Sequence, residues 1–112
     1  MRIFTTLICI FLLLAVNGQQ QKPITVKINT PTVQCEKCKK RIEDYMKVEE
    51  GVIKTVVDFK LKKTAVTYLL DRTNLENIKT AIANCGYDAE DVKAAPDIYV
   101  KLPTCCKKPS DQ

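Results

Sequence analysis

The feature that most constrains this fold is the order in which hydrophobic periodicity changes along residues 24–94. Apolar and polar residues alternate over 24–29, which predicts a half-buried strand. From Cys35 the apolar residues instead recur every fourth position, and charged residues occupy the positions between them. That spacing predicts an amphipathic helix that ends before Gly51.

The second half of the pattern repeats the alternation twice and then returns to a helix. Alternating residues over 52–59 and 64–70 predict two strands, and a hairpin is the simplest link between them. Thr73 and Glu76 have the spacing of a capping box, and apolar residues follow at helical spacing as far as Gly86, a residue type that ends helices. The residues expected to share one face of each strand are Ile53, Thr55, Val57 and Phe59, and then Val66, Tyr68 and Leu70.

Residues 89–94 predict a short edge strand, which completes the order strand, helix, strand, strand, helix, strand. This order is typical of the ferredoxin-like α+β fold, a βαββαβ sandwich in which a four-stranded antiparallel sheet carries both helices on one face. We expect the domain over 24–94, after a polar linker over 19–23. Residues 95–112 contain three prolines and two cysteines and predict an irregular tail.

The first 18 residues have the layout of a secretory signal peptide. A positively charged start precedes an almost wholly apolar stretch over 3–16, and cleavage is expected after Gly18. An apolar stretch of about fourteen residues is short for a membrane-spanning helix, although a retained N-terminal anchor is the alternative. Cys9 lies inside this stretch and is expected to leave with it. We therefore expect the mature protein to be secreted across the inner membrane into a bacterial periplasm.

The absence of histidine excludes several classes of function. Without imidazole the chain cannot form Ser-His-Asp or Cys-His catalytic sites, nor zinc sites that use two histidines. The net charge is +5, but basic and acidic residues are interspersed, and the aromatic residues are few. No nucleic-acid partner is expected, because such a surface usually combines a basic stripe with aromatic residues.

The six cysteines are the candidate functional residues, and two of them form a motif. Cys35 and Cys38 have Cys-x-x-Cys spacing where a loop meets the first predicted helix, so their sulfurs can converge on one atom. The start of the helix, with Lys37 and Lys39 nearby, favours thiolate over thiol. Two thiolates without imidazole suit Cu(I) or Hg(II), with Cd(II) and Zn(II) as further candidates. A thiol-disulfide redox pair and a structural disulfide are the alternatives.

In this order of strands and helices, the chain resembles heavy-metal-associated domains, the family of copper chaperones, metal-ATPase domains and periplasmic mercuric-ion transport proteins. The resemblance covers 24–94 and rests on Cys35-Glu36-Lys37-Cys38, Ile42-Glu43, Met46, Gly51-Val52, Val57-Asp58, Val66, Ala81-Ile82 and Gly86-Tyr87-Asp88-Ala89. It implies that Cys35 and Cys38 bind the ion and that Tyr87 lies near it. Val33-Gln34 stands where the family usually has Met-Thr, and the tail lies outside the family's domain.

The other three cysteines have roles that the sequence leaves open. Cys85 is expected to be a small buried residue in the last turn of the second helix, and the resemblance makes it a minor candidate for a third sulfur. Cys105 and Cys106 can extend the first metal site, form a second one, or pair with Cys85 or another chain. Once Cys9 is removed five cysteines remain, so at least one stays unpaired in a monomer with only internal disulfides.

We therefore expect a protein that binds and transfers a soft metal ion and is not an enzyme. In this hypothesis an exposed, mobile loop before the first helix takes up the ion, and a partner's cysteine then enters as a third ligand. The basic residues Lys37, Lys39, Lys40 and Arg41 would attract that partner, a membrane metal transporter or another metal-binding protein. We expect a monomer. The alternatives are a thiol-disulfide redox protein and a structural or interaction module that binds no metal.

Overall fold

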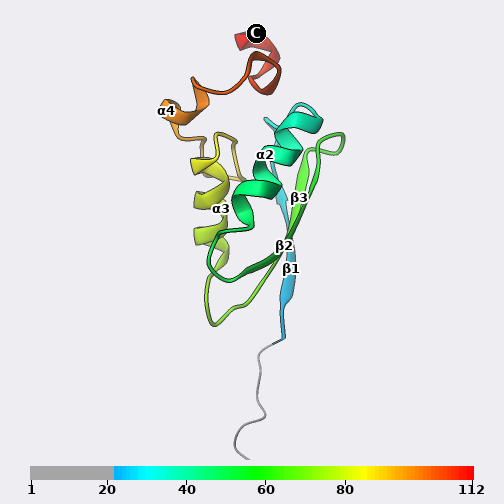
Figure 1. Cartoon of the computed structure of the whole chain (residues 1–112), viewed down its shortest axis with the longest axis vertical. Helices are drawn as coiled ribbons and strands as arrows, with labels where there is room; N and C mark the ends of the chain where they lie inside the picture. The colour runs from blue at the N-terminus through cyan, green and yellow to red at the C-terminus, as the bar shows by residue number, and fades with distance from the viewer. Residues whose placement is uncertain (1–21) are drawn as a thin grey trace, which may run out of the picture.

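The computed structural model describes residues 22–112 (Figure 1). The expected signal peptide, its cleavage point and Cys9 lie outside the described residues. Over 22–112, every helix is too short or too polar to span a bilayer. The elements in chain order are β1 (Ile24–Asn29), α2 (Glu36–Met46), β2 (Val52–Asp58), β3 (Lys63–Tyr68), α3 (Leu75–Asn84), α4 (Pro96–Tyr99), and the 3₁₀ turns η2 (Thr104–Cys106) and η3 (Pro109–Asp111).

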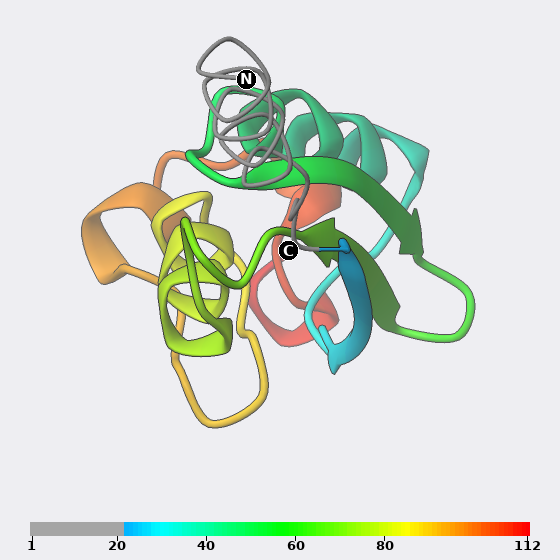
Figure 2. The same cartoon turned by 90° about the horizontal axis from the view of Figure 1, so that it is seen from below.

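The described strands form one antiparallel sheet in the order β1-β3-β2. Strand β3 is central, and it pairs with β1 from Ile24 opposite Tyr68 to Asn29 opposite Lys63. Along β3 every second residue is buried, and the residues between them are more exposed, so the helices cover one face of the sheet (Figure 2). This arrangement confirms the ferredoxin-like α+β fold class.

The fourth strand expected over 89–94 does not form in the described part of the chain. Ala89 and Val92 make a single isolated bridge instead. Between them Glu90 has a φ of 53°, a left-handed conformation that turns the chain away from an extended path. Its backbone N–H donates to the Asn29 carbonyl at 2.9 Å, and its carboxylate accepts the Asn29 N–H at 2.7 Å. Glu90 therefore pairs the backbone groups of Asn29, at one end of the β1 edge along which a fourth strand would lie.

A bulge in β2 changes which residues face the core. The register moves from Val52 opposite Tyr68 to Lys54 opposite Thr67, which leaves Ile53 as the extra residue. Ile53 is 55% exposed, whereas Val52 packs against the core. The expectation that Ile53 shares a face with the inward residues of β2 is therefore wrong, because alternation over this stretch is interrupted by the bulge.

The second helix is capped one residue later than the capping box predicts. The Asn74 side chain accepts the backbone N–H of Asn77 at 2.9 Å, which makes Asn74 the N-cap of α3. Thr73 is buried and packs beside Gly51, where an added Cβ would lie 2.9 Å from its methyl group. The side chain of Thr73 therefore packs against the turn at Gly51 and does not cap the helix as the sequence had predicted.

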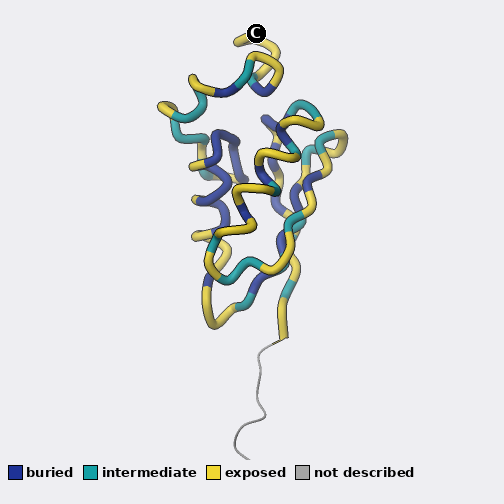
Figure 3. The backbone as a smooth tube through the Cα atoms, in the orientation of Figure 1, coloured by how far each residue is buried: buried dark blue, intermediate teal, exposed yellow. Residues whose placement is uncertain are grey.

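The tail beyond residue 94 is folded against the domain, where the sequence predicted irregular structure. It forms α4, η2 and η3, and it crosses the end of the molecule at which α2 begins (Figure 1). Leu102 and Cys106 of the tail belong to the hydrophobic core. The backbone of the tail shows short buried stretches between exposed ones (Figure 3). Leu102 packs on Gly86, so closely that an added Cβ there would lie 3.0 Å from its side chain. The C-terminal segment is therefore an integral part of the packed domain.

Candidate metal centre

The Cys-x-x-Cys motif lies where the sequence placed it, at the start of α2. Cys35 is the N-cap residue, with extended backbone, and its carbonyl accepts the Lys39 N–H at 3.1 Å. Cys38 lies one turn on, on the buried face of the helix that also presents Ile42 and Met46. The Sγ atoms of Cys35 and Cys38 are 3.4 Å apart, and both cysteines are free. The start of the helix thus brings two unbonded sulfurs together.

The loop that leads into the motif is anchored, although the hypothesis had it exposed and mobile. The hydroxyl of buried Thr30 is hydrogen-bonded to that of Thr64 at 2.9 Å, and Val33 has no exposed surface. Thr32 accepts the backbone N–H of Asp88 through its hydroxyl at 3.0 Å. The Lys62 ammonium donates to the Val33 carbonyl. Within the loop, Pro31 is exposed, and Gln34 and Cys35 are partly open to solvent.

The surroundings of Cys35 favour the thiolate. Burial alone would raise the pKa of this thiol, but hydrogen bonds from the Cys38 backbone, the Cys38 thiol and the Lys37 backbone outweigh it, and the pKa of Cys35 is lowered. These donors belong to the first turn of α2, where unpaired N–H groups and the helix dipole stabilise negative charge. Cys35 is therefore the partly exposed member of the pair with a lowered pKa, and Cys38 is its buried partner.

Two tail cysteines complete the cluster, and the sequence had left their place open. The Sγ atoms of Cys35, Cys105 and Cys106 all lie within 4.8 Å of one another. The Cys35 sulfur also lies 3.6 Å from the Cys105 carbonyl oxygen. Cys105 is exposed and Cys106 is buried. The surplus of cysteines was the only sequence signal, because nothing in the local pattern predicts a contact between segments 70 residues apart.

Tyr87 closes the buried side of the cluster. Its side chain has no exposed surface, and its hydroxyl makes no hydrogen bond within the described residues. Burial, followed by the thiols of Cys106 and Cys38, raises the pKa of Tyr87. The pKa of Cys106 is likewise raised, by burial first and then by Cys38. The resemblance placed Tyr87 near the ion, and the structure places it beside the sulfurs.

Cys85 lies outside the sulfur cluster. Its thiol donates towards the Arg41 carbonyl at 3.8 Å, while the Arg41 side chain donates to the Cys85 carbonyl at 3.3 Å. Burial raises the pKa of Cys85 to about 11, although Arg41 opposes this shift. The structure thus supports the interpretation of Cys85 as a small buried residue, and it does not bring Cys85 to the motif as a third sulfur.

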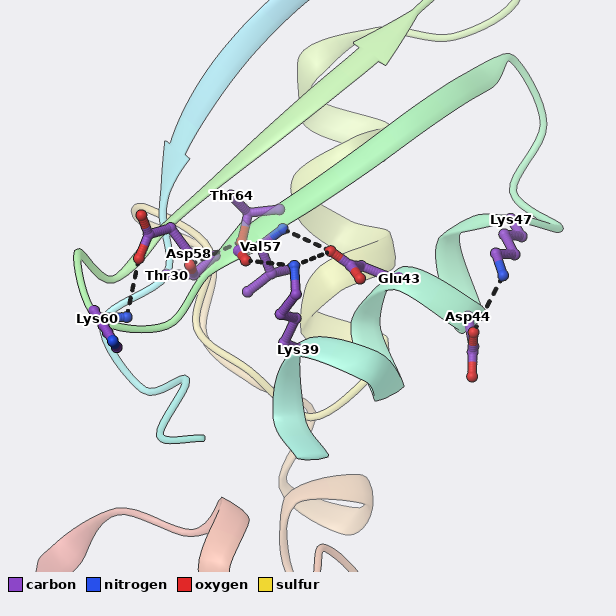
Figure 4. Close-up of polar contacts among 9 residues, drawn as sticks. All are labelled: Thr30, Lys39, Glu43, Asp44, Lys47, Val57, Asp58, Lys60 and Thr64. Carbon is purple, nitrogen blue, oxygen red and sulfur yellow. Dashed lines mark hydrogen bonds and ion pairs between the residues drawn. The ribbon is translucent and has the colours of Figure 1, made fainter. Parts of the chain in front are cut away.

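The basic residues of α2 are largely engaged in the domain itself. Lys39 pairs with Glu43 at 2.8 Å and donates to the Val57 carbonyl at 3.1 Å, while Glu43 accepts the Val57 N–H at 3.0 Å (Figure 4). This bridge fastens the first turns of α2 to β2. Lys40 pairs with Asp44 at 2.7 Å. The basic face expected from the sequence is therefore reduced, because Lys39 and Lys40 are neutralised by carboxylates one turn along.

Comparison with known proteins identifies the domain. The sequence model of the family described as the heavy-metal-associated domain matches residues 27–88. The chain belongs to the heavy-metal-associated domain family. It is 31% identical over 81 residues to the mercuric transport protein periplasmic component of Shewanella putrefaciens, which covers 72% of this chain and 88% of that relative. A copper-exporting P-type ATPase of Staphylococcus epidermidis is 32% identical over 65 residues, which is 58% of this chain and 8% of the ATPase.

Solved structures of this family share the fold. Oxidised MerP from Ralstonia metallidurans CH34 has a TM-score of 0.58 and 26% identity, and the match covers 62% of this chain and 96% of MerP. The heavy-metal-associated domain of this protein therefore has the expected fold, with three described strands in place of four, and carries the cysteine pair at the start of α2. The matched segment ends at residue 88, so the tail that brings Cys105 and Cys106 to the pair lies beyond it.

Proposed function

We propose that this protein binds one soft metal ion, Cu(I) or Hg(II), through Cys35 and Cys38 and transfers it to a partner. The observation that carries the proposal is the pair of free sulfurs 3.4 Å apart at the start of α2. Membership of the heavy-metal-associated domain family supports it. Cd(II) and Zn(II) remain further candidate ions, because both also accept thiolate ligands.

The distance between the two sulfurs suits a shared ion. Metal–sulfur bonds of about 2.3 Å allow two ligands of one ion to lie at most about 4.6 Å apart. The observed 3.4 Å is inside that limit, so the pair can open around an ion by a small rotation of one side chain. Cys35 is the residue that can rotate, since it is partly exposed, whereas Cys38 is fixed in the core.

Transfer would proceed by ligand exchange. A thiolate of the partner forms a bond to the bound ion before one of the bonds to Cys35 or Cys38 breaks, so the ion is never free and no electrons are transferred. We propose a membrane metal transporter or another metal-binding protein as the partner, and the periplasm as the compartment. The apolar segment over 3–16 and the similarity to a periplasmic mercuric transport component support that location.

The test is a metal titration of the protein purified anaerobically under reducing conditions. With Cu(I) or Hg(II) and a competing chelator, we expect one ion per chain. The double variant Cys35→Ser and Cys38→Ser should lose this binding, and Cys85→Ser, a buried cysteine outside the cluster, should keep it. Equally tight binding by the double variant would refute the assignment to this motif.

A dithiol redox function is the alternative that one observation favours. The lowered pKa of Cys35 beside a buried second thiol also suits thiol-disulfide exchange. A measured reduction potential and an insulin-reduction assay separate the two functions. Rapid insulin reduction without stoichiometric metal binding would favour the redox protein.

A further inference from the structure

We propose that the C-terminal tail supplies further ligands to the same ion, with Cys106 as the third sulfur and Cys105 as a fourth for ions that accept four. This inference rests on the proposed function, because it adds to the site at Cys35 and Cys38. Its basis is the gathering of the Cys35, Cys105 and Cys106 sulfurs within 4.8 Å of one another. Cys38 extends this group, since its sulfur is 3.4 Å from that of Cys35.

The spacing of the Cys35, Cys105 and Cys106 sulfurs fits a three-sulfur site with only small adjustments, and Cys38 lies outside this group but 3.4 Å from Cys35. With metal–sulfur bonds of about 2.3 Å, ligands lie about 4.0 Å apart in a trigonal site and about 3.8 Å apart in a tetrahedral one. The observed upper limit of 4.8 Å means that closure on an ion requires each of these sulfurs to move by no more than about 1 Å. Side-chain rotation at exposed Cys105 and half-buried Cys35 provides that movement without displacing the backbone.

The tail is positioned before any ion is bound. Leu102 is buried against Gly86, and the Cys106 N–H donates to the Pro103 carbonyl at 2.8 Å. Farther along, the Tyr99 hydroxyl bonds the Asp111 carboxylate and accepts the Lys108 N–H at 3.0 Å. These contacts hold the turn that carries Cys105 and Cys106, so little conformational entropy is lost when the sulfurs bind an ion.

A second observation points to the same place. The hydroxyl of Tyr87 is buried and lacks a hydrogen-bond partner among the described residues, and the thiols of Cys106 and Cys38 are its neighbours. Buried polar groups are rarely left unpaired. A metal-bound thiolate is a strong acceptor, so an ion held at this cluster would give the O–H group the acceptor that it lacks.

The position of the tail has a consequence for transfer. A ligand held within the chain acts at high effective concentration, so it slows loss of the ion to weak competitors. It also occupies the place that a partner's cysteine would take as third ligand. The partner must therefore displace a tail sulfur, which makes the tail a retaining arm for the ion. The matched family segment ends at residue 88 and does not include it.

The first experiment counts the sulfurs around the ion. The reduced protein is loaded with one equivalent of Hg(II), and the Hg–S coordination number is measured by X-ray absorption spectroscopy. We expect more than two sulfurs in the unmodified protein and two in the variant Cys105→Ser with Cys106→Ser. The chelator concentration that removes Hg(II) from the variant should also be at least about tenfold lower. Loss of even a residue that only supports a metal ligand lowers metal affinity by about that factor. The matched control is Cys85→Ser, which should change neither value.

A second measurement needs no variant. Cys105 is exposed and should react readily with iodoacetamide in the metal-free protein. One equivalent of Hg(II) should block its alkylation if it joins the ion. Two sulfurs in the unmodified protein would overturn the inference, and unchanged alkylation of Cys105 would refute its assignment as the fourth ligand; both results leave the pair at Cys35 and Cys38 in place. Absence of any stoichiometric Hg(II) would overturn the proposed function as well.

Discussion

Replacing Leu102 by alanine should release the tail from the domain while the domain itself stays folded. Leu102 is 4% exposed, and its methyl groups pack on Gly86. It is the largest buried apolar side chain that the tail adds to the core, where Cys106 and partly buried Tyr99 also pack, whereas the Tyr99–Asp111 hydrogen bond lies within the tail itself. The variant therefore tests the docking of the tail separately from the folding of the sheet and helices.

The size of the effect follows from the area that Leu102 buries. The change deletes three buried carbon atoms, each worth about 0.8 kcal/mol, or about 2.4 kcal/mol together. Because every 1.4 kcal/mol changes an equilibrium tenfold, the population of undocked tail should rise about 50-fold. A cavity that stays open would increase this value, and collapse of neighbouring side chains would lower it.

The alkylation rate of Cys106 measures this population. Cys106 is buried when the tail is docked, so under conditions where docking is fast its reaction with iodoacetamide tracks the undocked fraction. Exposed Cys105 is the internal reference and should react at a similar rate in both proteins. Leu61→Ala is the matched control, since Leu61 is 69% exposed in the hairpin turn and should change neither rate. An unchanged rate for Cys106 in Leu102→Ala would refute the assignment of Leu102 as the anchor.

Three further predictions concern other parts of the domain. Gly86→Ala places a Cβ 3.0 Å from Leu102 at a φ of 108°, so urea titration should show a loss of about 1–3 kcal/mol; an unchanged midpoint would contradict this packing. Asn74→Ala removes the cap of α3 and should cost about 1 kcal/mol, whereas Thr73→Ser should leave the cap intact. Since burial raises the pKa of Cys85 to about 11, its thiol should stay protonated and unreactive at pH 8 and react faster as the pH approaches 11; fast labelling at pH 8 in the folded protein would argue against that burial.

Local periodicity was sufficient to predict α2, α3, the hairpin and the position of the motif, but not α4. These elements depend on residues close in sequence, such as the stripe of Cys38, Ile42 and Met46 on α2. The prediction of a fourth strand was wrong because the path of this segment depends on Glu90. Its carboxylate accepts a backbone N–H of β1 from a residue 61 positions away. The misplaced cap has a similar origin, since Thr73 is drawn into packing with Gly51 across the domain.

Only the part of the candidate site that is local in sequence could be predicted. A Cys-x-x-Cys at the start of a helix can be recognised from spacing alone, and Cys35 and Cys38 lie where that spacing placed them. The approach of Cys106 depends on how Leu102 packs on Gly86, a contact between side chains that no periodicity encodes. An unexplained pair of cysteines beyond the recognised domain was the only signal that the sequence offered.

The burial of Cys38 sets the direction from which an ion can be approached. This sulfur is part of the interior, with no exposed surface, and the Lys39–Glu43 bridge fastens its turn of α2 to β2. Cys35 and Cys105 lie on the solvent side. A partner's thiolate must therefore approach a bound ion from the side of Cys35 and Cys105. The bond to Cys38 would then be the last of the pair to break, in the same order for every recipient.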